Sequence, residues 1–350
     1  MQMFGVIINY ITWAILAAAV LLLLIRLLVR KGRNSAPRGG ISKQMYVELG
    51  GVKQWIAIHG KDKNNPVLLY LHGGPGVSTS TYDHAFTRLW SDVYTVVTWD
   101  QRNCGKSWSP EQWDTKLTYD MMMEDALELI LFLRRFLGVE KVTLLGHSWG
   151  TYLGANLARE YPQFVEAYIG VGQLVDFYEN EEALKAEAEK WTEDDPVARL
   201  LVEKLSPEDL APGHFEARNK LLQKYHYDMF ARGRDYNLTA AKFFNPNYTL
   251  REYMKFYRAS SKVYRDFISS EEFERFSLTG RTSYQVPYFN VNGDQDYQCN
   301  HRLARAYFDQ VEAPFKKLYM MENMTHGLMA SRSKEFSRIL HEIASEMKNR

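Results

Sequence analysis

The chain has 350 residues, a length that corresponds to about two domains, or to one large α/β unit with an insertion. Its 43 basic and 42 acidic residues leave a formal net charge of +1, which excludes the broad basic field typical of proteins that bind nucleic acid. A hydrophobic fraction of 46% with 24% charged residues excludes a disordered or collagen-like chain, and two cysteines, Cys104 and Cys299, make neither a disulfide framework nor a C-x-x-C zinc site.

The chain begins with an apolar segment. Residues 1–25 carry no charged side chain, and as a helix they would extend over roughly 37 Å, enough to cross a hydrocarbon core of about 30 Å. The basic residues follow this segment, at Arg26, Arg30, Lys31, Arg33 and Arg38. A cleaved signal peptide is the alternative, but it would carry its basic residues first and small residues at its end. Because basic flanks favour the cytoplasmic side, the sequence predicts a single-pass transmembrane anchor over residues 1–30, with the rest of the chain in the cytoplasm.

Strand-like and helix-like patterns alternate after the anchor. The Gly-, Pro- and Arg-rich residues 31–44 predict a linker, and two strand-length segments on either side of Gly50-Gly51, at 45–49 and 53–59, predict a hairpin. Short β-rich runs of the kind that is buried in parallel sheets follow at residues 67–71, 93–99, 142–145, 165–171, 286–291 and 316–321. Helical patterns separate several of them, at residues 122–137, 149–161 and 333–348. This alternation predicts an α/β fold with a doubly wound, mostly parallel sheet.

One long segment interrupts the alternation. Residues 173–284 contain helix starts such as S-P-E-D at 206–209, but no convincing pair of strands. Aromatic residues crowd this segment, including Trp191, Tyr225, Tyr227, Phe230, Phe243, Phe244, Tyr253 and Phe256. We therefore expect a helical cap inserted into the sheet domain. The expected organisation is an anchor (1–30), a linker (31–44), the first part of the core (45–172), the cap (173–284) and the second part of the core (285–350).

The candidate nucleophile lies in the segment G-H-S-W-G at residues 146–150. This G-x-S-x-G pattern follows the predicted strand 142–145 and precedes the predicted helix 149–161, which is the setting of a nucleophile elbow. The glycines permit a sharp turn that presents the hydroxyl of Ser148 above the sheet, and the helix N-terminus behind it favours an oxyanion. A serine that merely caps the helix is the alternative.

A second glycine-rich turn, H-G-G-P-G at residues 72–76, directly follows the predicted strand 67–71. Backbone N–H groups in such a turn point into the cleft above the nucleophile. We expect the oxyanion to be held by the N–H groups of Gly74 and Trp149. A phosphate-binding loop is the alternative, but the turn is followed by no G-K-S/T sequence and contains no G-x-G-x-x-G pattern.

The candidate acid and base lie late in the chain. The turn G-D-Q-D at residues 293–296 follows a predicted strand, and it offers Asp296 as the acid, with Asp294 as the alternative. His326 is the candidate base, because it lies in the loop N-M-T-H-G at residues 323–327, between the last predicted strand and the closing helix.

Three motifs together resemble the proline iminopeptidase branch of the α/β-hydrolase superfamily: H-G-G-P-G at 72–76, D-Q-R-N-C-G-K-S at 100–107 and G-H-S-W-G at 146–150. The chain order Ser148, Asp296, His326 is also that of α/β-hydrolases. The resemblance covers roughly residues 45–172 and 286–345. It implies an α/β-hydrolase fold with the inserted segment as a helical cap, these three residues as nucleophile, acid and base, and no metal or organic cofactor.

The sequence departs from the pattern of this family in three places. Asn103 stands where glycine is usual, G-D-Q-D at 293–296 replaces the common G-R-Y-D, and Thr325 precedes the histidine where glycine is common.

The substrate is less well specified than the chemistry. Cap glutamates bind the free α-amine of the substrate in this family, and Glu179, Glu181 and Glu182 are the candidates here, although acidic residues in such a helix more often form a solvated face. We expect a serine hydrolase that works through an acyl-enzyme, with an aminopeptidase acting on short peptides as the first expectation. A carboxylesterase or thioesterase acting on acyl esters is the second, suggested by the anchor and the aromatic cap. A non-catalytic relative that binds a partner through its cap is the third.

Overall fold

The computed structural model describes residues 2–208, 210–211, 213–226, 234–249, 251–253, 263, 267 and 276–350. Part of the expected cap segment lies outside these residues, as do three of its aromatic side chains, Tyr227, Phe230 and Phe256.

Eight strands form one sheet in the order β1-β2-β4-β3-β5-β6-β7-β8. The strands are β1 (Ile41–Leu49), β2 (Val52–Gly60), β3 (Val67–Leu71), β4 (Thr95–Asp100), β5 (Val142–His147), β6 (Val165–Val171), β7 (Tyr288–Gly293) and β8 (Lys316–Met321). The pairs β1–β2 and β2–β4 are antiparallel, and the other pairs are parallel. The doubly wound, mostly parallel sheet predicted from the sequence is confirmed. β7 begins two residues later than predicted because Pro287, which has no N–H to donate, precedes it.

Helices cover the two faces of this sheet. The described helices are α1 (Gln2–Asn34), α2 (His84–Thr87), α3 (Tyr119–Leu137), α4 (Trp149–Glu160), α5 (Phe177–Trp191), α6 (Pro196–Val202), α7 (His214–Tyr225), α8 (Leu238–Phe243), α10 (His301–Gln310), α11 (Leu328–Ser331) and α12 (Ser333–Lys348). Side chains of α3, α4 and α10 share one buried cluster with the sheet, and side chains of α2, α11 and α12 share the other. Helices thus flank the sheet on both sides, as in other α/β proteins.

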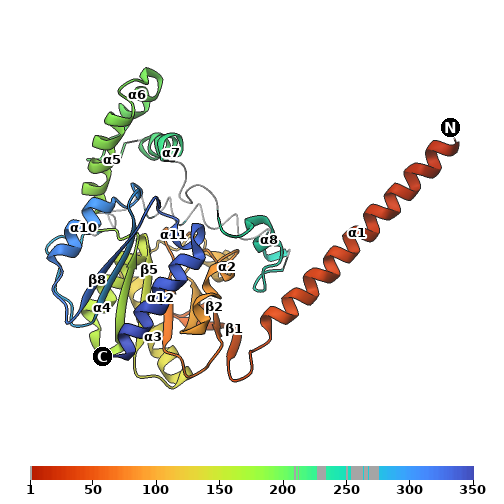
Figure 1. The fold of residues 1–350 in the computed structure, drawn as a ribbon, viewed down its shortest axis with the longest axis horizontal. Coiled ribbons are helices and arrows are strands. Elements are labelled where there is room, and N and C mark those ends of the chain that lie inside the picture. Colours follow the sequence, from red (N-terminus) through yellow and green to blue (C-terminus); the bar gives the residue numbers. More distant parts are fainter. Residues whose placement is uncertain are drawn as a thin grey trace.

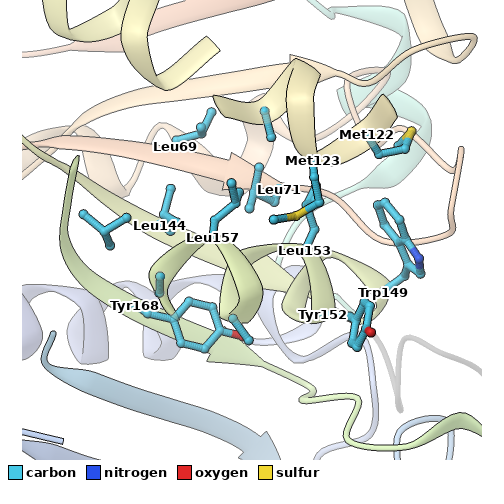
Figure 2. Packing of buried hydrophobic residues seen from close by; sticks show 14 of the residues in the cluster. Leu69, Leu71, Met122, Met123, Leu144, Trp149, Tyr152, Leu153, Leu157 and Tyr168 are labelled. Atoms are coloured by element: carbon cyan, nitrogen blue, oxygen red, sulfur yellow. The ribbon is translucent and has the colours of Figure 1, made fainter. Parts of the chain in front are cut away.

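Successive residues of a strand reach opposite faces of the sheet. Leu69 and Leu71 of β3 belong to the cluster with α3 and α4, where Figure 2 shows Leu71 close to Leu153. Leu68 and Tyr70 belong to the cluster with α2 and α12. Because both faces are buried, the strand reads as a continuous apolar run rather than an alternating one. This burial fixes the register of the central strands and so the position of the loops at their ends.

The cap segment is helical wherever the structure describes it in regular form. Helices α5, α6, α7 and α8 fall within residues 173–284, and the first three share a small core of their own. Its buried members are Ala188, Ala198, Val202, Leu205, Ala217 and Leu221.

Helix α1 projects away from the sheet and the cap, and its N-terminus lies far from the rest of the chain (Figure 1). Residues 7–34 form a candidate membrane span of 28 residues, whose most apolar window has a mean hydropathy of 2.5 and is only 6% buried. The length and composition of this helix suit a membrane span, and a signal sequence near an N-terminus has the same properties.

The basic end of α1 is bound to the cap. Arg26 is only 4% exposed and donates from Nε to the carbonyl oxygen of Phe243 at 2.7 Å and from Nη2 to that of Tyr248 at 2.8 Å. Arg33 donates to the carbonyl oxygen of Phe244 at 2.9 Å. Two of the arginines expected to flank the membrane therefore donate hydrogen bonds to backbone oxygens at and just after the end of α8, which ties α1 to the cap.

The expected linker is shorter in the structure. Residues 31–34 complete α1 and residues 41–44 open β1, which leaves residues 35–40 as the connection. The contacts of the last turn of α1 explain this difference: Asn34 donates to the carbonyl oxygen of Pro246 at 3.0 Å and accepts a hydrogen bond from Gln44 at 2.8 Å.

Candidate active site

Ser148 occupies a sharp turn between β5 and α4. Its backbone has φ 57° and ψ −128°, a conformation that residues with a side chain rarely adopt. A Cβ at Gly146 would lie 2.3 Å from the carbonyl oxygen of Gly150, and a Cβ at Gly150 would lie 2.2 Å from that of Leu71 in β3. The expected turn between strand and helix is therefore present, and it needs glycine at both positions because it packs tightly against itself and against the end of β3.

Asp296 and His326 meet although they come from different loops. Nδ1 of His326 lies 2.8 Å from Oδ2 of Asp296, and both side chains are buried. Oδ1 of the same carboxylate accepts hydrogen bonds from the backbone N–H groups of Gln298 and Cys299, each at 3.0 Å. The carboxylate thus holds the proton of the imidazole on Nδ1, which leaves Nε2 as the nitrogen able to take up a proton.

The other candidate acid, Asp294, has a different place. Its Oδ1 accepts a hydrogen bond from the backbone N–H of Met324 at 3.2 Å, and Gln295 donates its backbone N–H to the carbonyl oxygen of Met324 at 2.9 Å. A Cβ at Gly293 would lie 2.1 Å from that same oxygen. Asp294 therefore joins the two loops to each other, while Asp296 is the aspartate that contacts the imidazole.

Gly172 and His147 shape the surroundings of this pair. A Cβ at Gly172, whose φ is +57°, would lie 3.0 Å from Nδ1 of His326 and 3.1 Å from Oδ2 of Asp296. His147 Nε2 lies 3.0 Å from the carbonyl oxygen of His326, so this nitrogen carries the proton and donates it to the carbonyl. Burial, and after it the neighbouring His326 imidazole, lowers the pKa of His147 to about 3. His147 is therefore a neutral packing and positioning residue at ordinary pH.

Ser148 and His326 line one cavity of about 440 Å³. Most of its lining is apolar or aromatic, and it also includes the expected oxyanion loop through Gly74. The described lining residues are Tyr70, Gly73, Gly74, Val77, Thr79, Tyr82, Phe86, His147, Ser148, Asn219, Leu238, Lys242, Gln298, His326, Gly327, Met329 and Ala330. Among them Lys242 carries the permanent charge, and none is an aspartate or glutamate.

The glycine loop expected to help hold an oxyanion approaches Ser148 closely. A Cβ at Gly73 would be 2.9 Å from Cβ and 3.5 Å from Oγ of Ser148, so the loop 72–76 passes directly over the serine. Gly74 has φ +125° and lines the cavity. Trp149 is the first residue of α4, and N–H groups in the first turn of a helix have no acceptor within that helix.

The D-Q-R-N-C-G-K-S segment connects the site to the cap through Asp100. Burial raises the pKa of Asp100, whose carboxylate accepts hydrogen bonds from Ser78, from the backbone N–H of Lys106 at 2.7 Å and from the hydroxyl of Tyr248 at 3.1 Å. Ser78 follows the oxyanion loop and Tyr248 belongs to the cap, so one buried carboxylate joins both. Asn103, where the family has glycine, has φ 59°, a left-handed conformation that asparagine tolerates better than most residues.

The three candidate glutamates of the cap fall into two groups. Glu179 and Glu182 are exposed, as a solvated helix face predicts. Glu181 is fully buried and accepts hydrogen bonds from Nε of Arg218 at 2.7 Å and from His214 at 2.9 Å. Burial acts to raise the pKa of Glu181, but Arg218 and His214 outweigh it, and the pKa is lowered. Glu181 is therefore an ionised structural group whose oxygens are already occupied, and the solvated-face interpretation is wrong for this residue.

Cys299 is a neighbour of Ser148 that the sequence patterns did not indicate. Its Sγ lies 4.0 Å from Oγ of Ser148. Burial, together with the Asp296 carboxylate, raises the pKa of this thiol well above its usual value, so it remains protonated. Within the described ranges, no group of three or more His, Cys, Asp or Glu side chains is arranged to hold a metal ion.

Simple patterns in the sequence could have indicated the places of Cys299, Gln298 and Glu181. Cys299 and Gln298 follow Asp296 by three and two positions, so they had to share its turn. Glu181 precedes Leu184 and Ala188 by three and seven positions, which places it on the apolar stripe of its helix rather than on the solvated side.

Comparison with known proteins agrees with this geometry. A model of the α/β hydrolase fold family matches residues 66–311. The chain belongs to this family. It is 27% identical to the probable aminopeptidase YbaC of Bacillus subtilis over 304 residues, which cover 80% of this chain and 89% of that protein. It is 28% identical to the proline iminopeptidase of Neisseria gonorrhoeae over 200 residues, which cover 56% of this chain and 59% of that protein. The resemblance to proline iminopeptidases that the motifs indicate is confirmed.

Solved structures share the fold at low sequence identity. A membrane phospholipase A described as a bacterial virulence factor superposes with a TM-score of 0.62 at 17% identity, and the match covers 100% of both chains. A proline iminopeptidase-related protein of Thermus thermophilus superposes with a TM-score of 0.60 at 20% identity, covering 88% of this chain and 98% of that one.

The low pKa of His147 predicts a pH dependence of stability. The pKa of the His147 imidazole is about 3 in the folded protein, against an ordinary value of 6.5 in the unfolded chain. As the pH falls, the unfolded state therefore binds a proton before the folded state does, which favours unfolding. The contribution of His147 is therefore complete above about pH 6.5 and is lost progressively toward pH 3. Relative to His147→Gln, the wild type should lose free energy of unfolding between pH 7 and pH 4, by at most about 1.4 kcal/mol per pH unit. Chemical denaturation of both proteins at several pH values measures the difference; a constant difference would contradict the prediction.

Proposed function

We propose that the protein is a serine hydrolase in which Ser148 is the nucleophile, His326 the base and Asp296 the acid that orients it. The observation that carries this proposal is the hydrogen bond between Asp296 and His326, whose imidazole lines the same cavity as the elbow serine. No other described imidazole of this cavity serves, because His147 is held neutral and donates to the backbone.

The reaction would proceed through an acyl-enzyme. His326 Nε2 takes the proton of Ser148 as Oγ attacks the carbonyl carbon, and the N–H groups of Gly74 and Trp149 bind the oxygen that becomes negative. His326 then gives its proton to the leaving amine or alcohol as the bond to the carbonyl carbon breaks. Water, deprotonated by the same imidazole, attacks the acyl-enzyme and releases the acid, which restores Ser148. Each step is a proton or acyl transfer between groups named here.

An aminopeptidase is the first candidate for the substrate specificity. The relative from Bacillus subtilis, which matches over most of its length, is named a probable aminopeptidase, and several shorter matches are named proline iminopeptidases. Glu181 does not act as the amine-binding group in this proposal, since Arg218 and His214 occupy its oxygens. Recognition of a free α-amine would use other groups around the cavity.

An esterase acting on acyl esters is the second candidate, and the cavity supports it. The described lining is mostly apolar or aromatic and contains a lysine but no carboxylate, which suits a neutral acyl chain better than an ammonium group. The apolar helix α1, bound to the cap beside α8, agrees with a substrate that partitions into a membrane.

We further propose that α1 anchors the protein in a membrane with the hydrolase domain on the cytoplasmic side. The helix is long and apolar enough to span a bilayer, and its basic residues follow the apolar stretch.

Substitution of a residue of the proposed triad should lower activity far more than substitution of a neighbouring residue. Ser148→Ala should abolish turnover and labelling by a fluorophosphonate probe, and Asp296→Asn should lower kcat by about 10³- to 10⁴-fold because the imidazole tautomer is no longer fixed. Asp294→Asn is the matched control, since an amide oxygen can still accept from Met324, and its activity should stay within about threefold of the wild type. Near-normal turnover by Ser148→Ala, or a larger loss in Asp294→Asn than in Asp296→Asn, would defeat the assignment. A folded wild type that never reacts with the probe would favour a non-catalytic role.

A substrate panel should separate the two candidate specificities. Prolyl and alanyl arylamides are compared with their N-acetyl derivatives and with short and long acyl esters, each by kcat/KM. The aminopeptidase proposal expects the free-amine arylamides to be the best substrates and acetylation to remove activity, because the amine is part of what is recognised. Higher values for the acyl esters, rising with chain length, would instead support the esterase.

Membrane attachment should be visible after fractionation. The full chain should sediment with membranes and resist extraction at alkaline pH, as an integral protein does. In sealed, right-side-out vesicles its C-terminus should be protected from added protease, whereas a tag at the N-terminus should be cleaved. Release into the soluble fraction with loss of residues 1–30 would identify a signal peptide instead, and cleavage of the C-terminus would reverse the orientation.

A further inference from the structure

Gln298 lies between the proposed acid and the cavity. Its backbone N–H donates to Oδ1 of Asp296 at 3.0 Å, and the residue lines the cavity together with Ser148 and His326. It also lines a second, smaller pocket that includes His326 but not Ser148. Gln298 therefore shares both pockets with His326, whereas Gly73 and Gly74 of the proposed oxyanion loop line only the larger one.

Arg218 fixes which way the amide of Gln298 points. Nη1 of Arg218 donates to Oε1 of Gln298 at 3.0 Å, and Nη2 donates to the backbone oxygen of Gln298 at 3.1 Å. Because a guanidinium only donates hydrogen bonds, the amide atom facing it must be the oxygen. The other amide atom is then Nε2, which carries two N–H donors. Asn180 also donates to the backbone oxygen of Gln298, at 3.0 Å, so the residue is held at several points.

A buried chain of hydrogen bonds keeps Arg218 in this position. Arg218 is 3% exposed, and its Nε donates to both oxygens of Glu181, at 3.0 and 2.7 Å. His214 accepts the backbone N–H of Ser206 on Nδ1 at 3.0 Å, so its Nε2 carries the proton that is donated to Glu181 at 2.9 Å. Glu181 thus accepts hydrogen bonds from His214 and from Nε of Arg218, while Nη1 and Nη2 of Arg218 donate to Gln298.

In the proposed mechanism, the leaving group of the substrate lies beside His326. His326 delivers its proton to the leaving group, so a side chain beside His326 faces the leaving group rather than the acyl group. Two N–H donors at that place bind an oxygen acceptor and offer nothing to a cation.

We propose that Gln298 is a specificity-determining residue that binds a carbonyl oxygen in the leaving group of the substrate. The inference rests on the proposed serine hydrolase function and specifies its substrate class: an amide or ester whose leaving group carries a further carbonyl close to the bond that is cleaved. The next residue of a peptide supplies such a carbonyl, and so does the second acyl group of a diester. Arg218 acts through Gln298 as a positioning residue.

Shape-matched substrates test the proposal. One pair consists of alanyl-glycinamide and alanyl-isobutylamide, and the other of the glycolamide ester and the isobutyl ester of butanoic acid. Within each pair the leaving groups have nearly the same shape, but only the first carries a carbonyl oxygen. The ratio of kcat/KM within a pair is compared between enzyme variants, so that differences in intrinsic reactivity cancel.

Gln298→Met removes the donors while keeping the length of the side chain and the backbone N–H to Asp296. The ratio should fall by about five- to twentyfold in at least one pair, mainly through KM, as expected when a partly desolvated carbonyl loses its donor. Gln298→Glu should lower the ratio at least as far, because a carboxylate then faces the carbonyl oxygen. Gln295→Met is the matched control, since Gln295 lies in the same loop but does not line the cavity of Ser148, and its ratios should stay within twofold. The pair that responds identifies the peptide or the ester as the source of the carbonyl.

Labelling of Ser148 by a fluorophosphonate separates the possible failures. Variants that label at the wild-type rate but leave both ratios unchanged would overturn the role of Gln298 and leave the proposed function standing. A wild type that neither labels nor turns over any of the four substrates would overturn both.

Discussion

The contact between the Asp296 carboxylate and the His326 imidazole is the interaction on which the site depends. It requires two loops, after β7 and β8, to approach within 2.8 Å, and it is possible because these two strands are parallel neighbours that end at the same edge of the sheet. Gly293 lets the loops touch, and Gly172 at the end of β6 leaves room for the pair. A side chain at Gly293 would push against the backbone oxygen of Met324, and a side chain at Gly172 would push against the Asp296–His326 pair itself.

Buried polar groups extend this arrangement into the cap. Burying the charges of Glu181 and Arg218 costs free energy that their mutual attraction offsets only when the geometry is good and the remaining lone pairs are satisfied. Here the Glu181 carboxylate also accepts a hydrogen bond from His214, and the Arg218 guanidinium also donates one to Gln298, so each charged group has a further partner. Such a pair contributes less to stability than to position, because it allows one relative placement of the cap helices and the acid loop.

A second polar connection is centred on Asp100. Asp100 binds Ser78, which follows the oxyanion loop, and Tyr248, which belongs to the cap. The backbone oxygen of Tyr248 in turn accepts from Arg26 of α1. Hydrogen bonds through Tyr248 and Asp100 therefore link helix α1, the cap and the segment that follows the loop beside Ser148, so the basic end of α1 is held against the folded domain.

The sheet architecture and the sharp turn at Ser148 could be predicted from the sequence, because both depend on local patterns. A doubly buried strand reads as a continuous apolar run, and a turn with the backbone of Ser148 admits only glycine at positions 146 and 150. The choice between Asp294 and Asp296 required the tertiary structure, because both lie in the same turn. They differ in their partners: Asp294 accepts from the backbone of Met324, and Asp296 contacts the imidazole of His326. The tertiary structure also shows that Glu181 is buried and paired and that Gln298 lines the cavity. Their partners lie more than thirty positions away along the chain, and a hydrogen bond between such residues depends on how separate elements pack, which no local pattern records.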